Sequence, residues 1–357
     1  MQQAPSPSSI SYEEPRDRSA LLSGGEPVPQ LDKTISLSVV VPTYQRPELL
    51  QRCLSALTSQ TMDADRYEII VVDDGASLDT WKAVKALAAS GSAPAIRYLA
   101  SFPRKGPAAA RNLGWRAARG DVIAFTDDDC IASPDWLAAG WAMFADLGLS
   151  GAWGRIVVPL PEEPTDHDWN TKGLERSPCA TANCFYRKTA LASVGGFDER
   201  FTTAWREDSD LQFTLLERGG RLTPCDRAVV VHPARSAPWG ISLRQQRNNL
   251  FNALLYKKHP DLYRNKLQAR PPWRYYVIVG ALLGTTVAGI MMPSPAWAIG
   301  FASIWAGLTA EFCVRRLRNT TRRPGHVAEM IITSALIPPL AIFWRLLGAI
   351  RYRTPFL

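Results

Sequence analysis

The stretch LSVVVPTYQRPELLQRCLSALTSQ, residues 37–60, combines two patterns. Its first part is a largely apolar, β-branched run that ends at Pro42, which is typical of a buried strand. In its second part Leu50, Leu54 and Leu57 recur at helical spacing. The stretch therefore predicts a buried strand followed by a helix.

Strand and helix patterns continue to alternate after this stretch. Buried-strand patterns recur at residues 67–76, 96–101 and 121–125, and helical patterns at residues 80–90 and 106–120. Apolar strands that alternate with helices are typical of a parallel sheet covered on both faces. We therefore predict an α/β fold with a mostly parallel central sheet, in which ligands bind at the carboxyl ends of the strands.

Polar residues follow three of the predicted strands, as PTYQRP (42–47), DDGA (73–76) and TDDD (126–129). We expect these segments to converge on one edge of the sheet. Adjacent carboxylates repel each other, so three in a row suggest a cation, a turn or solvent exposure. Asp74 before Gly75 is by itself a good turn pair. The pattern fits a nucleotide site, with turn chemistry as the alternative.

Further acidic residues occur downstream. Glu207 and Asp208 begin a predicted helix, where the helix dipole favours negative charge, so a simple acidic first turn is one interpretation. Another strand pattern, VVVHP (229–233), ends in a lone His232, which taken alone is more often structural than a ligand.

Both ends of the 357-residue chain differ from its middle. Residues 1–34 are rich in Pro, Ser and Gly and lack a run of signal-peptide length, which predicts a disordered arm and no secretion. Residues 264–357 hold twelve Lys and Arg and two acidic residues, which gives this segment a net charge of +10. Because the whole chain has a net charge of +8, the residues before it sum to −2. Because these basic residues flank apolar segments, anionic lipid is a better expected partner than nucleic acid.

The six cysteines show no CxxC pair and no spacing of a disulfide scaffold, which predicts neither a zinc site nor a disulfide framework. A reduced, cytosolic setting fits. Cys130, beside the aspartates, is either a thiolate ligand or a small packing residue. Packing is favoured, because the hard cations that carboxylates prefer seldom choose sulfur.

Tyr275–Ala310 is a run of 36 residues without a formal charge. Because a bilayer span needs ~20 helical residues, the run predicts a hairpin of two short spans that turns at Pro293–Pro295, with a pair of buried core helices as the alternative. Basic residues flank both ends of the run, which places both ends in the cytoplasm. A third apolar segment, residues 330–344, contains Pro338 and Pro339, and an interfacial or re-entrant helix is slightly preferred there over a span.

Six motifs together resemble family-2 inverting glycosyltransferases with the GT-A type fold. In chain order they are VVVPTYQRP, IIVVDDGA, GPAAARNLG, AFTDDDC, VGGFDERF and REDSDLQFTLLERGG, and the resemblance covers about residues 36–235. It implies that Asp127 and Asp129 are the DxD pair that holds Mg²⁺ or Mn²⁺ on the diphosphate of a nucleotide sugar. Asp128 is expected to face ribose or solvent, since alternate residues at a strand end point to opposite sides.

The resemblance also implies roles for other donor-site residues. Asp73 would accept a hydrogen bond from the base, and Arg111 would contact the base or a phosphate. The nucleotide would be lined by Pro42, Thr43 and Tyr44. His232 would complete the metal or phosphate site, as a histidine does in some relatives.

The ED pair implies the catalytic base. Direct displacement at the anomeric carbon needs a carboxylate that takes the proton of the acceptor hydroxyl, and inversion follows. Asp208 is the favoured base and Glu207 the competing candidate.

The segment SLRQQRNNLFNALLY partly resembles the QxxRW element of processive synthases. It holds Gln245, Gln246 and Arg247, but Asn248 stands where the Trp would be, which argues against processive synthesis. Arg244 and Arg247 would meet the diphosphate or an acceptor phosphate, with a solvated helix face as the equal alternative.

The leading hypothesis is a membrane-attached inverting glycosyltransferase whose catalytic domain lies on the cytoplasmic face. It would use a nucleotide sugar, with a UDP-sugar favoured, and a lipid-linked or glycan acceptor. The predicted parts are the arm (1–34), the catalytic domain (35–263) and the membrane region (264–357), which holds a hairpin at about 275–314 and an interfacial or spanning helix at about 327–350. A catalytically silent nucleotide-sugar-binding or scaffold module is the alternative. A dinucleotide-dependent oxidoreductase is disfavoured, because no GxGxxG follows the first strand.

Overall fold

The computed structural model describes residues 35–89 and 94–356. The arm predicted for residues 1–34 lies outside the described residues. Thr34–Leu357 forms one compact unit. The predicted boundary between residues 263 and 264 stays a prediction.

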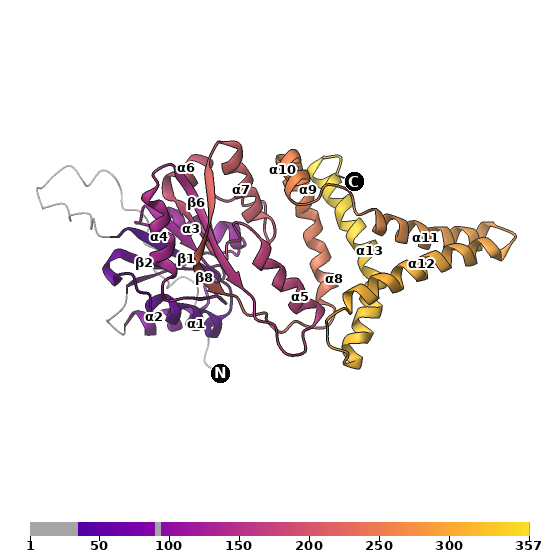
Figure 1. The fold of residues 1–357 in the computed structure, drawn as a ribbon, viewed down its shortest axis with the longest axis horizontal. Coiled ribbons are helices and arrows are strands. Elements are labelled where there is room, and N and C mark those ends of the chain that lie inside the picture. The colour runs from indigo at the N-terminus through magenta and orange to yellow at the C-terminus, as the bar shows by residue number, and fades with distance from the viewer. Residues whose placement is uncertain (1–34, 90–93, 357) are drawn as a thin grey trace, which may run out of the picture. The chain divides into compact units, whose positions relative to one another are not determined.

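An eight-stranded sheet with the order β3-β2-β1-β4-β7-β6-β8-β5 forms the centre of the fold (Figure 1). The first four strands in this order are parallel, whereas β7 is antiparallel to both β4 and β6, and β5 is antiparallel to β8. The predicted α/β fold with a mostly parallel central sheet is confirmed. The strands are β1 (Leu37–Thr43), β2 (Tyr67–Asp73), β3 (Ala95–Ala100), β4 (Val122–Phe125), β5 (Ile131–Ala132), β6 (Leu149–Val157), β7 (Cys184–Arg187) and β8 (Arg221–Val231).

Helices cover both faces of the sheet, because alternate residues of its central strands are buried in two separate cores. Val39 and Val41 of β1 pack in one core with α1 (Pro47–Thr58) and α4 (Trp136–Ala142). Val40 lies in the other core. That core also contains residues of α3 (Pro107–Ala117), α6 (Lys188–Val194) and α7 (Glu207–Glu217). A strand buried on both faces favours a near-continuous apolar run, and β1 and β2 show it at residues 39–41 and 69–72.

A third core joins the α/β part to the helices that follow it. It contains Phe201 and Phe213 from the α7 region, Phe251 and Tyr263 from later helices, and Phe356 near the end of the chain. The helices concerned are α9 (Asn249–Lys258) and α10 (Pro260–Lys266), which follow the short helix α8 (Ile241–Gln245). The C-terminal helices therefore share buried surface with the part that carries the acidic residues.

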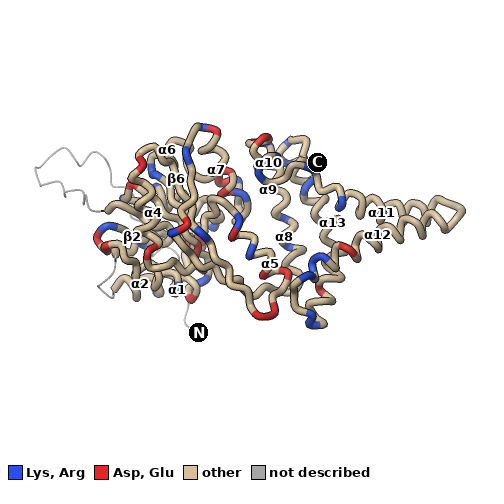
Figure 2. Tube along the Cα trace, viewed as in Figure 1, with Lys and Arg blue, Asp and Glu red and all other residues tan. Residues whose placement is uncertain are grey.

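Two long apolar helices form a hairpin, α11 (Trp273–Met291) and α12 (Pro295–Arg316) (Figure 1). The chain turns at residues 292–294, which overlap the predicted turn at Pro293–Pro295. Side chains such as Leu283, Ile290 and Trp297 are exposed, and Figure 2 shows no charged residue on the distal half of the hairpin. Both helices, and α13 after them, are long and apolar enough to cross a membrane, by length and composition.

α13 runs from Pro324 to Tyr352 and contains Pro338 and Pro339 in its interior. The helix contains the apolar segment 330–344 and extends slightly beyond the predicted helix of about 327–350 at both ends. The helix continues because it packs closely on α9: a Cβ at Gly348 would lie 2.8 Å from the Leu250 carbonyl oxygen. Tertiary packing of this kind outweighs the local cost of proline. The interfacial or re-entrant placement of this segment stays a prediction.

Candidate active site

The carboxyl ends of β1, β2 and β4 meet at one edge of the sheet, as the sequence pattern predicts. Thr43 and Asp73 are register partners at the ends of β1 and β2, and β4 runs parallel to β1 on its other side and ends at Phe125, just before the three aspartates. A hydrogen bond from Thr43 Oγ1 to Asp128 Oδ2, 2.8 Å long, connects the first strand end to the third. The parallel register therefore gathers the polar segments that are separate in sequence.

Asp128 points back toward the β1 end. Its side chain is buried, and its carboxylate accepts hydrogen bonds from Thr43 and from Arg46 Nη1 at 3.2 Å. Burial raises the pKa of Asp128, and the Arg46 charge opposes that rise only in part. The expectation that Asp128 faces solvent is wrong, because the loop after β1 covers it. The ribose alternative stays a prediction.

Arg111 joins Asp127 to Glu207. Its buried guanidinium donates from Nη2 to Asp127 Oδ1 and from Nη1 to Glu207 Oε1, both at 2.9 Å. Burial alone would lower the pKa of Arg111, but the two carboxylates outweigh it and raise that pKa. The sequence predicts that Arg111 contacts base or phosphate. In the structure Arg111 forms an ion pair with each of two candidate site acids, and its contact with a base or phosphate stays a prediction.

Glu207 and Asp208 differ in their surroundings although they are adjacent at the start of α7. Glu207 is buried, and burial raises its pKa to about 7, against the opposing charge of Arg111. Asp208 is half-buried, and its carboxylate accepts hydrogen bonds only from Ser209 among the described residues. Asp208 is thus the acid of this pair that is open to a ligand.

Residues before α7 fix where its acidic first turn lies. Arg206 has a positive φ of 76°, an uncommon conformation for a residue with a side chain. Asn252 of α9 accepts hydrogen bonds at its Oδ1 from Arg206 Nε at 2.8 Å and from Trp205 Nε1 at 3.2 Å. The contact with α9 therefore positions the segment that carries Glu207 and Asp208.

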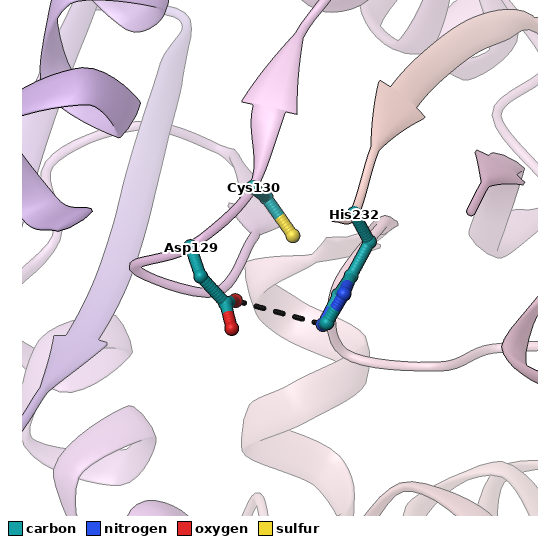
Figure 3. Close-up of side chains that lie close together, drawn as sticks. All are labelled: Asp129, Cys130 and His232. Atoms are coloured by element: carbon teal, nitrogen blue, oxygen red, sulfur yellow. Dashed lines mark ion pairs between the residues drawn. The ribbon is translucent and has the colours of Figure 1, made fainter. Parts of the chain in front are cut away.

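Asp129 and His232 lie together at the ends of β4 and β8, and Cys130 lies beside them (Figure 3). His232 Nε2 is 3.5 Å from Asp129 Oδ1. Arg235 Nε is 2.9 Å from Asp129 Oδ2, an ion pair without hydrogen-bond geometry, and His232 Nδ1 has no partner among the described residues. Burial raises the pKa of the Cys130 thiol, and the nearby aspartates raise it further.

This donor set fits a divalent cation. A carboxylate and an imidazole are ligands that Mn²⁺ and related ions accept. His232 Nδ1 and Asp129 Oδ2 are buried and form no hydrogen bond among the described residues, so the pocket holds polar atoms that a ligand could satisfy.

Asp73 is fully buried at the end of β2. Its Oδ2 accepts hydrogen bonds from the Ser77 backbone at 2.8 Å and from the Tyr98 hydroxyl at 2.9 Å, whereas Oδ1 has no partner among the described residues. A buried carboxylate oxygen without a donor is costly, so it is a good acceptor for a ligand N–H.

Tyr44 packs on the turn that follows Asp73. A Cβ at Gly75 would lie 2.8 Å from Tyr44 Cε2, so only glycine fits there. Arg104 stacks on the Tyr44 ring, with its guanidinium carbon 3.9 Å from the ring centroid. Pro42 is half-buried within β1, opposite Val72. These residues line the same strand ends as Asp73.

Arg244 and Arg247 are not brought to the aspartates. Both are exposed, and Arg247 lies over the ring of Trp344 in α13 at 5.9 Å. Within the described ranges neither forms an ion pair with an acid of the site. The alternative of a solvated helix face is the one that this geometry favours.

Several residues of the site carry no recognisable signal in the sequence. Arg235 follows β8 in an irregular segment, and Asn252 and Tyr98 lie in ordinary helix and strand patterns. Arg104 precedes the helix α3 motif, and nothing in its spacing indicates a ring contact.

Residues 38–195 match the model of the family described as glycosyl transferase family 2. The chain contains a family-2 glycosyltransferase domain. The matched residues carry β1, β2, β4 and the three aspartates, so the predicted resemblance is confirmed.

Curated glycosyltransferases and a solved structure are similar to this family-2 chain. Glycosyltransferase AglE of Haloferax volcanii is 29% identical over 221 residues, which cover 59% of the chain and 70% of the relative. Validoxylamine A glucosyltransferase of Streptomyces hygroscopicus is 34% identical over 272 residues, which cover 63% and 61%. The pre-mycofactocin glycosyltransferase of Mycobacterium tuberculosis is 29% identical over 240 residues, and the match spans about half of its length, at 48%.

The mannosyltransferase PcManGT from Pyrobaculum calidifontis, solved with GDP-Man and Mn²⁺, shares the fold. It superimposes with a TM-score of 0.56 at 18% identity over 91% of each chain. The predicted GT-A type fold is confirmed by this likeness.

Proposed function

We propose that the chain transfers a sugar from a nucleotide-sugar donor to a hydroxyl group of a membrane-bound acceptor, with inversion at the anomeric carbon. One observation carries the proposal: Arg111 holds Asp127, from the strand ends, and Glu207, from the start of α7, on one guanidinium. A donor site and a candidate base are thereby parts of one connected arrangement.

Asp73 supports binding of the nucleobase. Its free, buried Oδ1 would accept the ring N–H that both uracil and guanine carry, and its other oxygen is fixed by Tyr98. Thr43, Tyr44 and Pro42 would line the nucleotide beside it. PcManGT is described with GDP-Man, which supports a nucleotide-sugar donor in this fold. A UDP-sugar stays our favoured donor.

Asp127, Asp129 and His232 would hold Mg²⁺ or Mn²⁺ on the donor diphosphate, and Asp128 would lie near the ribose. Such an ion, when bound, neutralises the diphosphate and makes it a better leaving group. Arg235, which pairs with Asp129, is 44% exposed, so it can turn away to admit the ion. PcManGT contains Mn²⁺, which supports this assignment.

Asp208 would act as the base. It takes the proton of the acceptor hydroxyl as that oxygen attacks the anomeric carbon, while the bond to the diphosphate oxygen breaks and the nucleoside diphosphate leaves. Glu207 is buried and held by Arg111, so its carboxylate is less accessible to an acceptor hydroxyl than that of the half-buried Asp208.

The acceptor would be lipid-linked or close to the membrane, because three apolar helices follow the catalytic part. Arg residues at the ends of the hairpin favour a cytoplasmic catalytic site. In the third core, α9 packs against α13. The same helix α9 contacts the start of α7 through Asn252. The arrangement therefore ties the proposed base to the membrane region.

A donor screen tests the proposal. UDP-, GDP- and dTDP-sugars are added with Mn²⁺, and a donor that binds the folded chain should raise its melting temperature. The responding donor, radiolabelled in the sugar, is then incubated with membrane lipids. Label in the lipid phase supports transfer, whereas binding without any transfer or release of nucleoside diphosphate would indicate a silent binding module.

A further inference from the structure

Asp129, Cys130 and His232 form a cluster in which one ligand atom from each residue lies within 4.8 Å of the others (Figure 3). All three side chains are buried. The cluster contributes one oxygen, one sulfur and one nitrogen. The sulfur atom has no part in the proposed transfer, and a packing role does not require it to lie beside two metal-binding groups.

The backbone fixes Cys130 opposite His232. Ile131 pairs with Val231 in the antiparallel ladder between β5 and β8, so the next position outward places Cys130 across from His232. Opposed residues in such a ladder have closely spaced Cβ atoms. The thiol and the imidazole are therefore held together by strand pairing and not by chance contact of mobile side chains.

The spacing suits a single metal ion. Metal–sulfur and metal–nitrogen bonds of ~2.3 and ~2.0 Å place tetrahedral ligand atoms about 3.5 Å apart. Atoms that already lie within 4.8 Å reach this spacing by small side-chain rotations. Thiolate sulfur favours Zn²⁺ and other thiophilic metals, whereas Mg²⁺ prefers oxygen ligands only.

We propose that Cys130 Sγ binds the active-site metal together with Asp129 and His232, so that the site prefers a thiophilic transition metal to Mg²⁺. The proposal rests on the proposed function only in that both use the same metal site. As the metal–sulfur bond forms, the Cys130 thiol gives its proton to solvent. Arg235, which is half-exposed, leaves Asp129 at the same time.

The experiment uses the full chain in detergent after treatment with a chelator. Co²⁺ is titrated in without any nucleotide, and sulfur-to-cobalt charge-transfer absorption is recorded in the near ultraviolet. Affinities for Cd²⁺ and Mg²⁺ are measured by calorimetry on the same protein. The wild type should show the charge-transfer band and bind Cd²⁺ more tightly than Mg²⁺.

Two cysteine variants give a matched pair. Cys130→Ser should lose the band and keep the Mg²⁺ affinity of the wild type. It should weaken Cd²⁺ binding by at least ~10-fold, because loss of even an outer-shell partner of a metal typically weakens binding by that factor. Cys53→Ser is the control, because Cys53 is also buried near the aspartates, with Sγ 3.5 Å from the Asp127 carbonyl oxygen, but lies outside the cluster. It should keep both the band and the Cd²⁺ affinity.

Three results would overturn the proposal: no band in the wild type, a band that survives in Cys130→Ser, or a band that Cys53→Ser removes. Absence of the band in the wild type would overturn the proposal even if Cys130→Ser fails to fold. Failure of the proposed function is a different result, since a chain without sugar transfer would still show the cobalt band.

Discussion

Arg111 Nη1 donates a hydrogen bond to Glu207 Oε1 at 2.9 Å, across 96 positions of sequence. Both side chains are buried, and the same guanidinium also holds Asp127. Burying charges is costly, and removing one partner of a buried pair leaves the other uncompensated. The contact therefore makes the position of the acidic start of α7 depend on the strand-end aspartates.

Arg111→Met should lower the melting temperature by roughly 10 °C. Loss of one partner of a buried ion pair typically costs about 3–5 kcal/mol, and each kcal/mol corresponds to about 2–4 °C for a domain of this size. Adding Glu207→Gln should restore part of the loss, because it removes the stranded carboxylate. Thermal unfolding followed by circular dichroism measures both.

Arg116→Met on the same helix is the control, because its pair with Glu199 is exposed and 3.7 Å long. An effect of Arg116→Met equal to that of Arg111→Met would contradict the role given to the buried pair.

Asp208→Asn should lower the turnover number by ~10²–10⁴ and leave donor affinity nearly unchanged. A base that takes a proton only as the new bond forms acts on the transition state and not on donor binding. Glu207→Gln, which keeps a group that can accept from Arg111, should retain more activity. Transfer kinetics and donor calorimetry on the two variants make the comparison. If Glu207→Gln loses transfer and Asp208→Asn keeps it, the base is Glu207.

The strand ends could be predicted from sequence because they depend on local pattern. The apolar run before Pro42 and the runs before Asp73 and Asp127 each specify a buried strand, and parallel strands bring their ends together. Asp208 and His232 were found by resemblance to a family, since a helix cap and a structural histidine explain each of them equally well in isolation.

The contacts of the site could not be predicted, because they depend on side chains far apart in sequence. Arg111 turns to two acids, and Arg235 to Asp129, only once the sheet and α7 are packed. Asp128 was expected to face ribose or solvent, because successive residues of a strand point to opposite sides. The chain has left β4 by residue 126, so this alternation no longer applies to Asp128. The extent of α13 depends on its packing against α9, which no local proline rule describes.

Asp198 should stabilise the fold most above its ordinary pKa. Burial by itself would raise the pKa of Asp198, but hydrogen bonds from Arg200 and Lys258 outweigh it and hold that pKa below its ordinary value of 3.8. A carboxyl whose pKa is lowered by folding contributes stability above its unfolded pKa, and this contribution is lost as the pH falls through the folded pKa. The loss therefore begins near pH 4 and continues below it.

Asp198→Asn should lower the melting temperature at pH 7 by about 2–4 °C, the equivalent of ~1 kcal/mol for a partly exposed charged network. The difference from the wild type should shrink below pH 4. Asp226→Asn is the control, since Asp226 is exposed and forms no ion pair among the described residues. A difference that grows on acidification would give the wrong sign for the Asp198 contribution.

Leu283→Arg should reduce membrane retention of the chain. Leu283 is 61% exposed on the α11–α12 hairpin, and an arginine near the centre of a span costs about 2.5–3.5 kcal/mol on insertion. Leu147→Arg, at an 86% exposed position of the α/β part, should have no effect. Carbonate washing followed by fractionation measures retention. Membrane retention of Leu283→Arg equal to that of Leu147→Arg would contradict the burial of this position in lipid.

Metal-dependent donor binding tests the central claim most directly. The donor that responds in the screen is titrated into the full chain by calorimetry, with Mn²⁺ and with a chelator, for the wild type and for Asp129→Ala. We expect the wild type to bind the donor tightly only with Mn²⁺, and Asp129→Ala to lose this dependence while its circular dichroism spectrum stays that of the folded chain. Equal donor affinity in the wild type with and without Mn²⁺, or an unchanged metal dependence in Asp129→Ala, would contradict the account.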